Sequence, residues 1–335
     1  MIITFAELES TLHKLFVAYD FTPEKAALLA SVYAESTLDG VYSHGINRVP
    51  LFIEYIKKGV VNIHTEAECA NSFGLMERWD GHLGPGIINA TKCMNRAIEL
   101  AKTNGMGLVA LRNTNHWMRG GTYGWQAANA GCIGICFTNT QPNMPPWGGK
   151  ESRTGNNPLI IAIPRKGAHI VLDMALSQFA FGKINDYKLR KQLLPFPGGW
   201  DLNDELSNDP EKITQKERGL PIGYWKGSAL SMVLDMLVTI LSAGDSTYRI
   251  GQRSLESGIS QVFICIDPEQ FGDMDFQQKL LQEIIDYTHD GPPMKPGDKT
   301  YYPGEKTLLT RAKNLKEGIA INDTVWEKVV ALMKE

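Results

Sequence analysis

Apolar residues in the first 60 positions recur at helical spacing, between residues that start and end helices. Thr4 and Glu7 form a Ser/Thr-x-x-Glu capping box, and apolar side chains then follow on one helical face at Leu8, Leu12, Leu15 and Phe16. Proline in a first turn and glycine after a last turn mark further helix ends. These signals predict three helices, one after Thr4, one from Thr22-Pro23 to about Leu38 before Gly40, and one from Pro50 to near Gly59.

From about residue 70, short apolar runs alternate with loops rich in glycine, proline and asparagine. The runs predict strands at 108–112, 133–138, 159–163, 169–173 and 261–266. Helical spacing predicts helices at 88–103, 227–243 and 275–288, with two more near the end of the chain. Polar stretches at 194–218 and 291–306 are predicted to be loops. The fold class expected is therefore α/β, with a helical N-terminal part and a mixed middle part.

Composition narrows the class of protein. The chain has 335 residues, of which 43% are hydrophobic and 21% charged, and its net charge is −3. These values are typical of a soluble globular protein of about two domains, without a patch for nucleic acid or a membrane surface. The N-terminus lacks a signal peptide, and the longest apolar run, near 232–241, is interrupted by Asp235. Five scattered cysteines favour the reducing cytoplasm.

Two glycine patterns could bind a dinucleotide, but neither has the context of a Rossmann site. Gly105-Met106-Gly107-Leu108-Val109-Ala110 follows a predicted helix and enters a predicted strand, the reverse of the required order. Gly84-Pro85-Gly86 precedes a helix, but Asn89 occupies the position that requires a small residue. The next predicted strand ends in Arg112 instead of an acidic residue. A dinucleotide would therefore bind this chain outside a Rossmann fold.

The segment Tyr42-Ser43-His44-Gly45-Ile46-Asn47-Arg48 carries the first candidates for catalysis. Imidazole is the usual proton donor near neutral pH, and a guanidinium can grip a carboxylate with two hydrogen bonds. Reduction of a 2-oxo acid needs this pair, because hydride attacks the carbonyl carbon while a proton reaches its oxygen. The same residues also fit a histidine that caps a helix and an arginine that lies in solvent.

Other candidates follow predicted strands, where binding loops gather. His116 and Arg119 could line a pocket, or belong to a surface turn anchored by Trp117. Thr138-Asn139 and Gly155-Asn156-Asn157-Pro158 predict rigid loops near a ligand, or edge loops without a role in a site. Asp173 could orient a histidine or simply cap a strand.

Two helix starts could hold a pyrophosphate, at Trp225-Lys226-Gly227-Ser228 and at Gly304-Glu305-Lys306. A metal site is not expected, because no H-x-x-x-H or H-E-x-x-H spacing occurs. A serine hydrolase is not expected either, since the chain lacks a G-x-S-x-G elbow.

Several of these segments, in this order, resemble the type-2 malate/L-lactate dehydrogenase family. The resemblance covers essentially the whole chain, and the run around His116 is highly specific. It departs from the family at Gly155-Asn156-Asn157-Pro158, where Gly-Thr-Asn-Pro is usual, and in a one-residue extension after Pro164. The residues that carry the resemblance are Val41-Tyr42-Ser43-His44-Gly45, Leu111-Arg112-Asn113, Asn115-His116-Trp117-Met118-Arg119-Gly120-Gly121, Met144-Pro145-Pro146-Trp147-Gly148 and Gly223-Tyr224-Trp225-Lys226-Gly227-Ser228.

The resemblance implies a homodimer with an NAD-binding domain that is not a Rossmann domain and is built on a mixed, largely antiparallel sheet. It implies a helical domain from residues 1–70 and 290–335, on the substrate side and at dimer contacts, and an NAD-binding domain from 71–289. His44 matches the proton donor, and Arg48, His116 and Asp173 become expected residues of the catalytic site. The expected cofactor contacts are His169, Ile170, Val171, Leu172, Asp173, Met174, Ala175, Trp225, Lys226, Gly304, Glu305 and Lys306.

The expected reaction is reduction of a sugar-derived 2-oxo acid by NADH, with NADPH as the other possible cofactor. Oxidation of malate, lactate or ureidoglycolate and reduction of a cyclic imine are alternatives within the same family. A non-catalytic protein that binds the cofactor and a metal-dependent hydrolase are alternatives from other classes.

Overall fold

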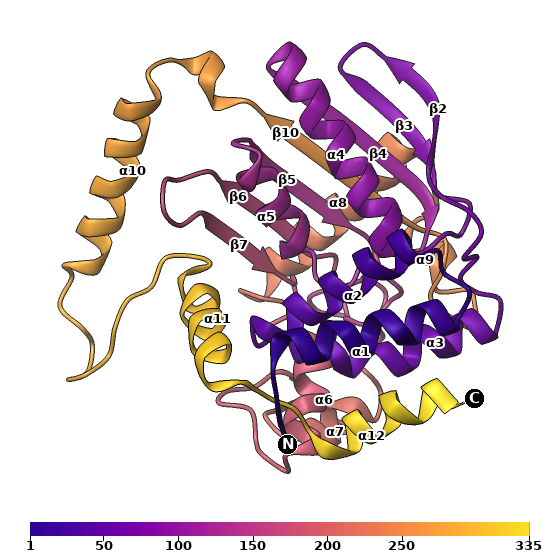
Figure 1. The fold of residues 1–335 in the computed structure, drawn as a ribbon. Helices are drawn as coiled ribbons and strands as arrows, with labels where there is room; N and C mark the ends of the chain where they lie inside the picture. The colour runs from indigo at the N-terminus through magenta and orange to yellow at the C-terminus, as the bar shows by residue number, and fades with distance from the viewer. Residues whose placement is uncertain (335) are drawn as a thin grey trace.

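A computed structural model describes residues 1–334 and shows a seven-stranded sheet with helices on both faces (Figure 1). All neighbouring strands pair antiparallel except β3 and β4, so the sheet is mixed and largely antiparallel, as predicted. The spatial order is β2 (Glu68–Phe73), β3 (Met76–Asp80), β4 (Met106–Thr114), β10 (Ile259–Ile266), β5 (Ile133–Thr138), β6 (Leu159–Ile163) and β7 (Ile170–Met174).

Side chains alternate between the two faces of the central strands, and each face has its own apolar core. Helices α4 (Gly86–Asn104) and α5 (Gly121–Asn129) cover one face, where Val109, Leu111 and Phe263 are buried. Helix α8 (Trp225–Ser242) covers the other face, where Ala110 and Val262 are buried. The alternation of the predicted strands is therefore satisfied by helices on both faces of the sheet.

A helical body lies beside one end of the sheet (Figure 1). It has one apolar core that includes side chains from both ends of the chain, and Met118 of the loop after β4 also packs into it. Two short strands, β1 (Ile2–Ile3) and β11 (Ile319–Ala320), pair antiparallel and join the chain ends. Its helices are α1 (Phe5–Ala18), α2 (Pro23–Leu38), α3 (Val49–Lys57), α11 (Glu305–Glu317) and α12 (Asp323–Ala331).

The segment predicted as a polar loop at 194–218 is more ordered than expected. Together with the residues just before it, this segment forms a small unit with its own buried side chains, Phe179, Ile184, Leu194 and Ile213. The prediction missed the elements within 194–218 because each of them is two to five residues long. The elements of the whole unit are α6 (Phe181–Leu189), β8 (Gly199–Trp200), β9 (Leu206–Ser207) and α7 (Pro210–Thr214).

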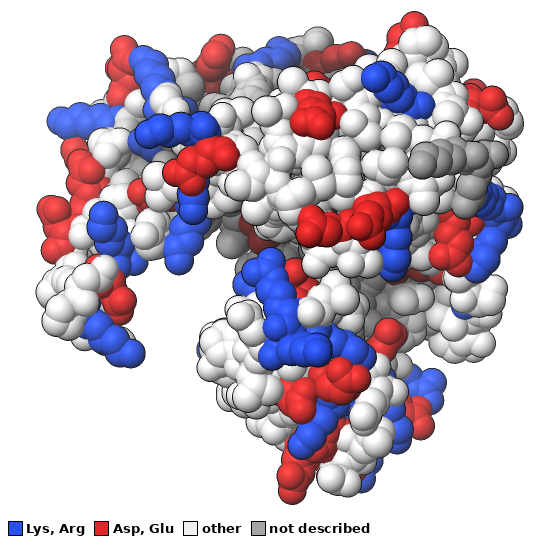
Figure 2. Space-filling model, turned by 60° about the horizontal axis from the view of Figure 1, so that its bottom comes forward, with Lys and Arg blue, Asp and Glu red and all other residues white. Residues whose placement is uncertain are grey.

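The remaining helices are α9 (Thr247–Ile250) and α10 (Met274–His289), and α10 stands away from the body of the molecule in Figure 1. Short 3₁₀ turns occur at Tyr42–His44, Ile46–Arg48, Pro268–Phe271 and Leu332–Lys334. By length and composition alone, α8 could cross a membrane, although a third of it is buried inside the molecule. On the face drawn in Figure 2, acidic and basic side chains are interspersed.

Candidate active site

A cavity of about 460 Å³ lies where the helical body meets β7, the loop after β4 and the start of α6. Segments from both ends of the chain form its walls, so it exists only in the complete fold. Polar and charged side chains on its walls are Ser43, His44, His116, Arg119, Thr138, Thr140, Asn156, Asp173, Lys183 and Thr307.

His44 enters the cavity from the 3₁₀ turn Tyr42–His44, which packs closely on the end of α2. A Cβ at Gly45 would lie 2.3 Å from Thr37 Oγ1, so only glycine fits there. The amide N–H of Ile46 donates to that same hydroxyl at 2.9 Å. Ser43 Oγ lies 3.0 Å from His44 Nδ1. The turn therefore holds the imidazole in one place, with its other ring nitrogen, Nε2, free for a ligand.

His116 lies beside His44, although 72 residues separate them in the sequence. The two rings are stacked, with centroids 5.7 Å apart and planes 26° apart. The amide N–H of Met118 donates to His116 Nδ1 at 2.9 Å, so a neutral His116 carries its proton on Nε2. The sequence-based expectation that these two histidines share one pocket agrees with this geometry.

Both imidazoles are held in the neutral form in the free protein. Burial lowers the pKa of His44 to about 4, with further lowering by the charges of Arg48 and Arg119. Burial also lowers the pKa of His116 well below its usual range, assisted by Arg48 and by His44. A bound anion would counter these positive charges and make protonation of His44 easier.

Arg48 lies behind His116 instead of in the main cavity wall. It lines a small adjoining hollow with Tyr55, Asn115 and His116. Burial raises the pKa of the nearby Glu256, and the positive charge of Arg48 opposes this rise. The guanidinium thus lies close enough to influence both histidines electrostatically.

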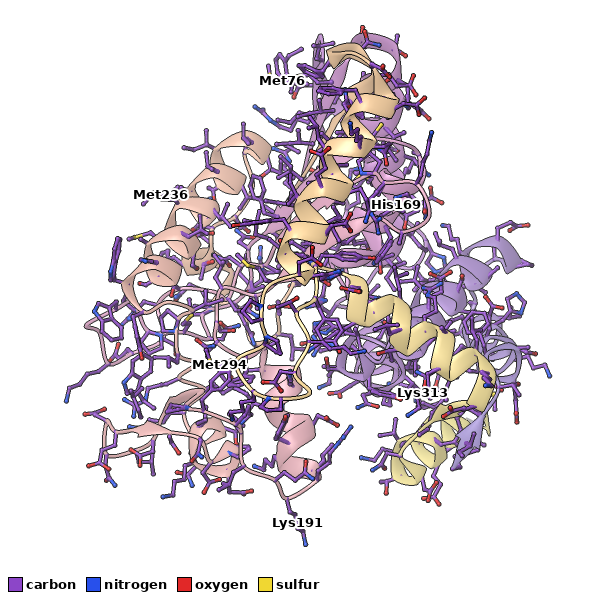
Figure 3. The ribbon with its side chains drawn as sticks, turned by 90° about the vertical axis from the view of Figure 1, so that its left-hand side faces the viewer. Met76, His169, Lys191, Met236, Met294 and Lys313 are labelled. Atoms are coloured by element: carbon purple, nitrogen blue, oxygen red, sulfur yellow. The ribbon has the colours of Figure 1, made fainter. Side chains whose placement is uncertain are left out.

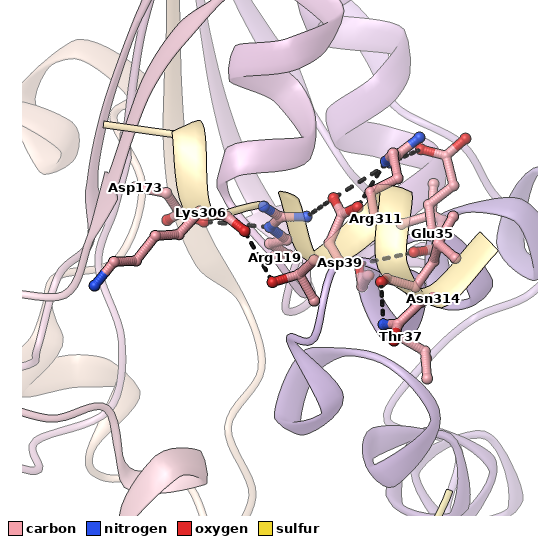
Figure 4. Close-up of polar contacts among 12 residues, drawn as sticks. Glu35, Thr37, Asp39, Arg119, Asp173, Lys306, Arg311 and Asn314 are labelled. Atoms are coloured by element: carbon pink, nitrogen blue, oxygen red, sulfur yellow. Dashed lines mark hydrogen bonds and ion pairs between the residues drawn. The ribbon is translucent and has the colours of Figure 1, made fainter. Parts of the chain in front are cut away.

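Asp173 faces Arg119 (Figure 4). Asp173 Oδ2 is 3.6 Å from Arg119 Nε, and Arg119 NH1 donates to Asp39 Oδ2 at 2.5 Å. The contacts of residues 1–334 include no hydrogen bond between Asp173 and His44, which the sequence had suggested. Asp173 shares the cavity with His44, but its charged partner is an arginine.

The expected cofactor residues divide into three groups. Five line the main cavity: Val171, Leu172, Asp173, Ala175 and Gly304. His169 lines a second cavity of about 380 Å³ with Trp125, Arg165 and Arg311, and Thr307 lines both cavities. The other six, which line neither cavity, are Ile170, Met174, Trp225, Lys226, Glu305 and Lys306.

Four residues of this last group lie at the starts of helices, Trp225 and Lys226 in α8 and Glu305 and Lys306 in α11. Trp225 is 61% exposed and Lys226 is exposed, both at the start of α8. Glu305 accepts hydrogen bonds from the amide of Tyr302 and from His289, and Lys306 lies over the ring of Tyr301.

An unpartnered polar atom and a close backbone approach suit this region to a ligand. Within residues 1–334, Trp125 Nε1 is buried beside the second cavity without a hydrogen-bond partner. Gly304 has φ +95°, and a Cβ there would lie 3.1 Å from the amide nitrogen of Val171. Buried polar groups of this kind are normally satisfied, so Trp125 Nε1 is available to donate to a bound molecule.

Sequence reasoning missed two charged residues near the cavity. Lys183 lines the cavity from the first turn of α6, in a segment without a recognisable motif. Asp39 follows the last residue of α2 and holds Arg119 from behind, and a lone acidic residue at a helix end is too common to attract notice. Among residues 1–334, no three His, Cys, Asp or Glu side chains gather as metal ligands.

The malate/L-lactate dehydrogenase family model matches residues 3–330. The chain is 43% identical to 2,3-diketo-L-gulonate reductase of Escherichia coli (strain K12) over 333 residues, which covers 99% of this chain and all of the relative. Malate dehydrogenase of Entamoeba histolytica has the same fold, with a TM-score of 0.94, 25% identity, and coverage of 100% of this chain and 97% of that one.

Malate dehydrogenase of Pyrococcus horikoshii OT3 gives a TM-score of 0.91 at 28% identity, over 100% of this chain and 95% of that one. The agreement thus extends over the full length in both sequence and structure. The chain belongs to the malate/L-lactate dehydrogenase family of oxidoreductases.

Proposed function

We propose that this protein reduces the sugar-derived 2-oxo acid 2,3-diketo-L-gulonate to 3-dehydro-L-gulonate, with NADH as the hydride donor. The observation that carries the proposal is the His44–His116 pair, which lies beside Arg48 and faces β7 across one cavity. The full-length similarity to a reductase of this substrate supports the choice of acid.

The proposed cofactor fits the two cavities beside β7, outside a Rossmann fold. A dinucleotide has two ring-bearing ends joined by a pyrophosphate, and β7 passes from His169 at one cavity to Asp173 and Ala175 at the other. Trp125 Nε1 would gain a partner, and Gly304 allows close approach along β7. Bound in this way, the nicotinamide supplies the hydride. NADH is the proposed donor and NADPH the alternative.

The side chains of the site have separate roles in the proposed reaction. His44 gives a proton to the carbonyl oxygen as hydride reaches the carbon, and Ser43 Oγ, 3.0 Å from its Nδ1, keeps the ring oriented. His116 offers its Nε2–H to a substrate oxygen. Arg48 lines the hollow that adjoins the main cavity at His116, so it would hold a carboxylate that extends past His116, because a guanidinium is suited to two parallel hydrogen bonds with that group.

Protonation of His44 is coupled to substrate binding in this proposal. In the free protein its pKa of about 4 keeps the imidazole neutral at pH 7. An anionic substrate would offset the charges of Arg48 and Arg119, which raises the pKa of His44. Substrate binding would therefore be accompanied by uptake of a proton from solvent at His44.

The separate apolar cores of the helical body and of the sheet support a division into a helical, substrate-side domain from 1–70 and 290–335 and a cofactor-binding domain from 71–289. We also propose a homodimer. Helix α8 exposes a continuous apolar stripe that includes Met236 and Ile240, and Met236 points away from the body in Figure 3. Trp225 and Lys226 start this helix, so a second copy could bring them to its partner's cofactor. All five cysteines are free thiols, which supports the proposed cytoplasmic location.

A panel of 2-oxo acids, followed at the NADH absorbance band, tests the function. We expect the highest kcat/KM with 2,3-diketo-L-gulonate and a lower value with NADPH in place of NADH. Absence of NADH oxidation across the whole panel would contradict the proposal and favour a protein that only binds the cofactor.

A second candidate is malate oxidoreduction, the activity named for two proteins of the same fold. Lys183 favours it, because this residue lines the cavity and its side chain could turn to meet a second carboxylate of the substrate. Oxaloacetate therefore belongs in the panel, and its preference over diketogulonate would select this candidate.

A further inference from the structure

Two contacts join the same pair of segments at the boundary between the helical body and the sheet. One is the stacking of His44 on His116. The other is the ion pair of Asp39, five residues before His44, with Arg119, three residues after His116. The ion pair thus lies beside the histidine pair and links the turn that carries one imidazole to the loop that carries the other.

The ion pair is almost completely buried. The side chain of Asp39 is 1% exposed and that of Arg119 is 6% exposed. Asp39 Oδ2 accepts from Arg119 NH1 at 2.5 Å, and Asp39 Oδ1 accepts from Arg311 Nε at 2.6 Å (Figure 4). Asp39 therefore joins three elements: the end of α2, the loop after β4, and α11.

Loss of the Asp39 charge would leave Arg119 with another carboxylate within reach. Asp173 Oδ2 already lies 3.6 Å from Arg119 Nε, on the cavity side. A buried guanidinium without its counter-ion turns toward the nearest anion, because an uncompensated buried charge is strongly unfavourable. Without Asp39, Arg119 would move into the cavity and the loop that carries His116 would move with it.

We propose that Asp39 is a positioning residue that keeps His44 and His116 stacked beside each other in the cavity wall. The proposal rests on the proposed function for its kinetic test, but its geometric part concerns the two imidazoles alone. Asp39 touches neither histidine and acts through Arg119.

The pKa of His44 can be measured without substrate, and it shows whether Arg119 has moved relative to the two imidazoles. Besides burial, the positive charge of Arg119 already helps to lower the pKa of His44, so an Arg119 that turns into the cavity without Asp39 lowers that pKa further. The charged and titratable groups near His44 on the elements around it are Arg48, His116, Arg119, Asp173 and Lys183.

The test compares Asp39→Asn with Glu77→Gln in the full-length protein. Glu77 is also a buried carboxylate paired with an arginine, Arg96, but it lies on β3. With Asp39→Asn we expect kcat to fall at least tenfold, Kd for NADH to change less than threefold, and the pKa of His44 measured by NMR to fall. We expect wild-type values of all three with Glu77→Gln.

A double variant shows whether Asp39 acts through Arg119. Asp39→Asn should have no further effect on kcat in an Arg119→Gln background, because the contact is already absent. Arg119→Lys, which keeps the charge but shortens the reach, provides the same kinetic and NMR tests if Asp39→Asn does not fold.

Three results would overturn the proposal: an unchanged kcat and His44 titration in Asp39→Asn, additive losses in the double variant, or a weaker Kd for NADH with kcat unchanged. The last would make Asp39 a cofactor contact, since it also borders the second cavity. If the wild-type protein reduces no acid in the panel, the proposed function fails. The pKa of His44 in Asp39→Asn then still tests whether Asp39 positions the two histidines.

Discussion

His44 combines a fixed orientation with an unusual acidity. Ser43 holds one ring nitrogen, His116 stacks on the ring, and burial favours the neutral form. We expect His44→Ala to lower turnover by about 10²–10⁴-fold, the usual contribution of general acid catalysis, while NADH still binds. Initial rates and NADH titration measure the two effects separately. His64→Ala is the control, because His64 is an exposed loop residue. Near-normal turnover in His44→Ala would remove this residue from the mechanism.

The pH dependence follows from the direction of the pKa shift. Reduction needs protonated His44, and burial lowers its pKa in the free protein to about 4. Above that pKa the protonated fraction falls with rising pH, so reductive kcat/KM should decrease steadily between pH 5 and 8. Oxidation of the hydroxy acid needs the neutral imidazole and should not decrease over this range. A reductive kcat/KM that rises with pH would contradict the assigned role.

Arg48 is expected to act on binding more than on chemistry. A hydrogen bond to a charged group contributes about 1.5–3 kcal/mol, so Arg48→Gln should raise KM for the oxo acid by roughly 10–100-fold with a smaller change in kcat. Arg48→Lys should recover part of this loss, because it restores the charge without the two-pronged geometry. If KM is unchanged in both variants, the carboxylate binds elsewhere.

The sequence indicated the chemistry of single residues better than their neighbours. His44 and His116 were expected in one pocket and are stacked there. Asp173 was expected to orient a histidine and faces Arg119 instead, because its partner depends on how β7 meets the loop after β4. Residue type thus predicts what a side chain can do, whereas only the tertiary fold determines which side chain it meets.

At the level of elements, the start of α11 is held against β7. Val171 N–H donates to Pro303 O at 2.9 Å, and Gly304 follows with φ +95°. Gly304→Ala adds a Cβ 3.1 Å from the Val171 amide nitrogen, so we expect a loss of about 1–3 kcal/mol in stability and weaker NADH binding. Urea unfolding and NADH titration measure these effects.

Gly297→Ala is a matched control for that change. Gly297 also has a positive φ, +89°, but no atom lies within 4 Å of an added Cβ. The difference between the two variants isolates the contact with β7. Equal losses of stability, with NADH binding unchanged in both, would show that this contact has no role in the cofactor site.

Long elements with clear end signals were predictable and short ones were not. The capping threonines Thr4 and Thr22 accept backbone hydrogen bonds at the starts of α1 and α2, as expected. The strands β2 and β3 were missed, because β2 is exposed along its whole length and lacks an apolar face. Helix α5 was missed because it directly follows a glycine-rich loop.

At the level of the whole molecule, the exposed stripe of α8 predicts a second copy. Ile240 is 73% exposed and Met236 is 56% exposed on a helix whose other side packs on the sheet. We expect Ile240→Glu to convert a dimer into a monomer in size-exclusion chromatography with light scattering. Leu189→Glu is the control, since Leu189 is exposed on α6, outside the helical domain that is expected at dimer contacts. A wild-type protein that is monomeric at all concentrations would contradict the proposed dimer.

The arrangement of the sheet could not be obtained from periodicity. β10 lies between β4 and β5, although about 120 residues separate it from β5, and one parallel pair interrupts the antiparallel pairing. Such pairings depend on contacts between distant segments, which alternating apolar residues do not encode. The resemblance to a family supplied the expectation of a mixed sheet, and the strand register was known only from the structure.

A crystal structure with NADH bound tests the central proposal most directly. It should show the nicotinamide ring in the cavity between β7 and the stacked pair His44 and His116, with the dinucleotide extending toward His169. A nicotinamide ring bound outside that cavity, or a His44 side chain turned into bulk solvent in the complex, would contradict it.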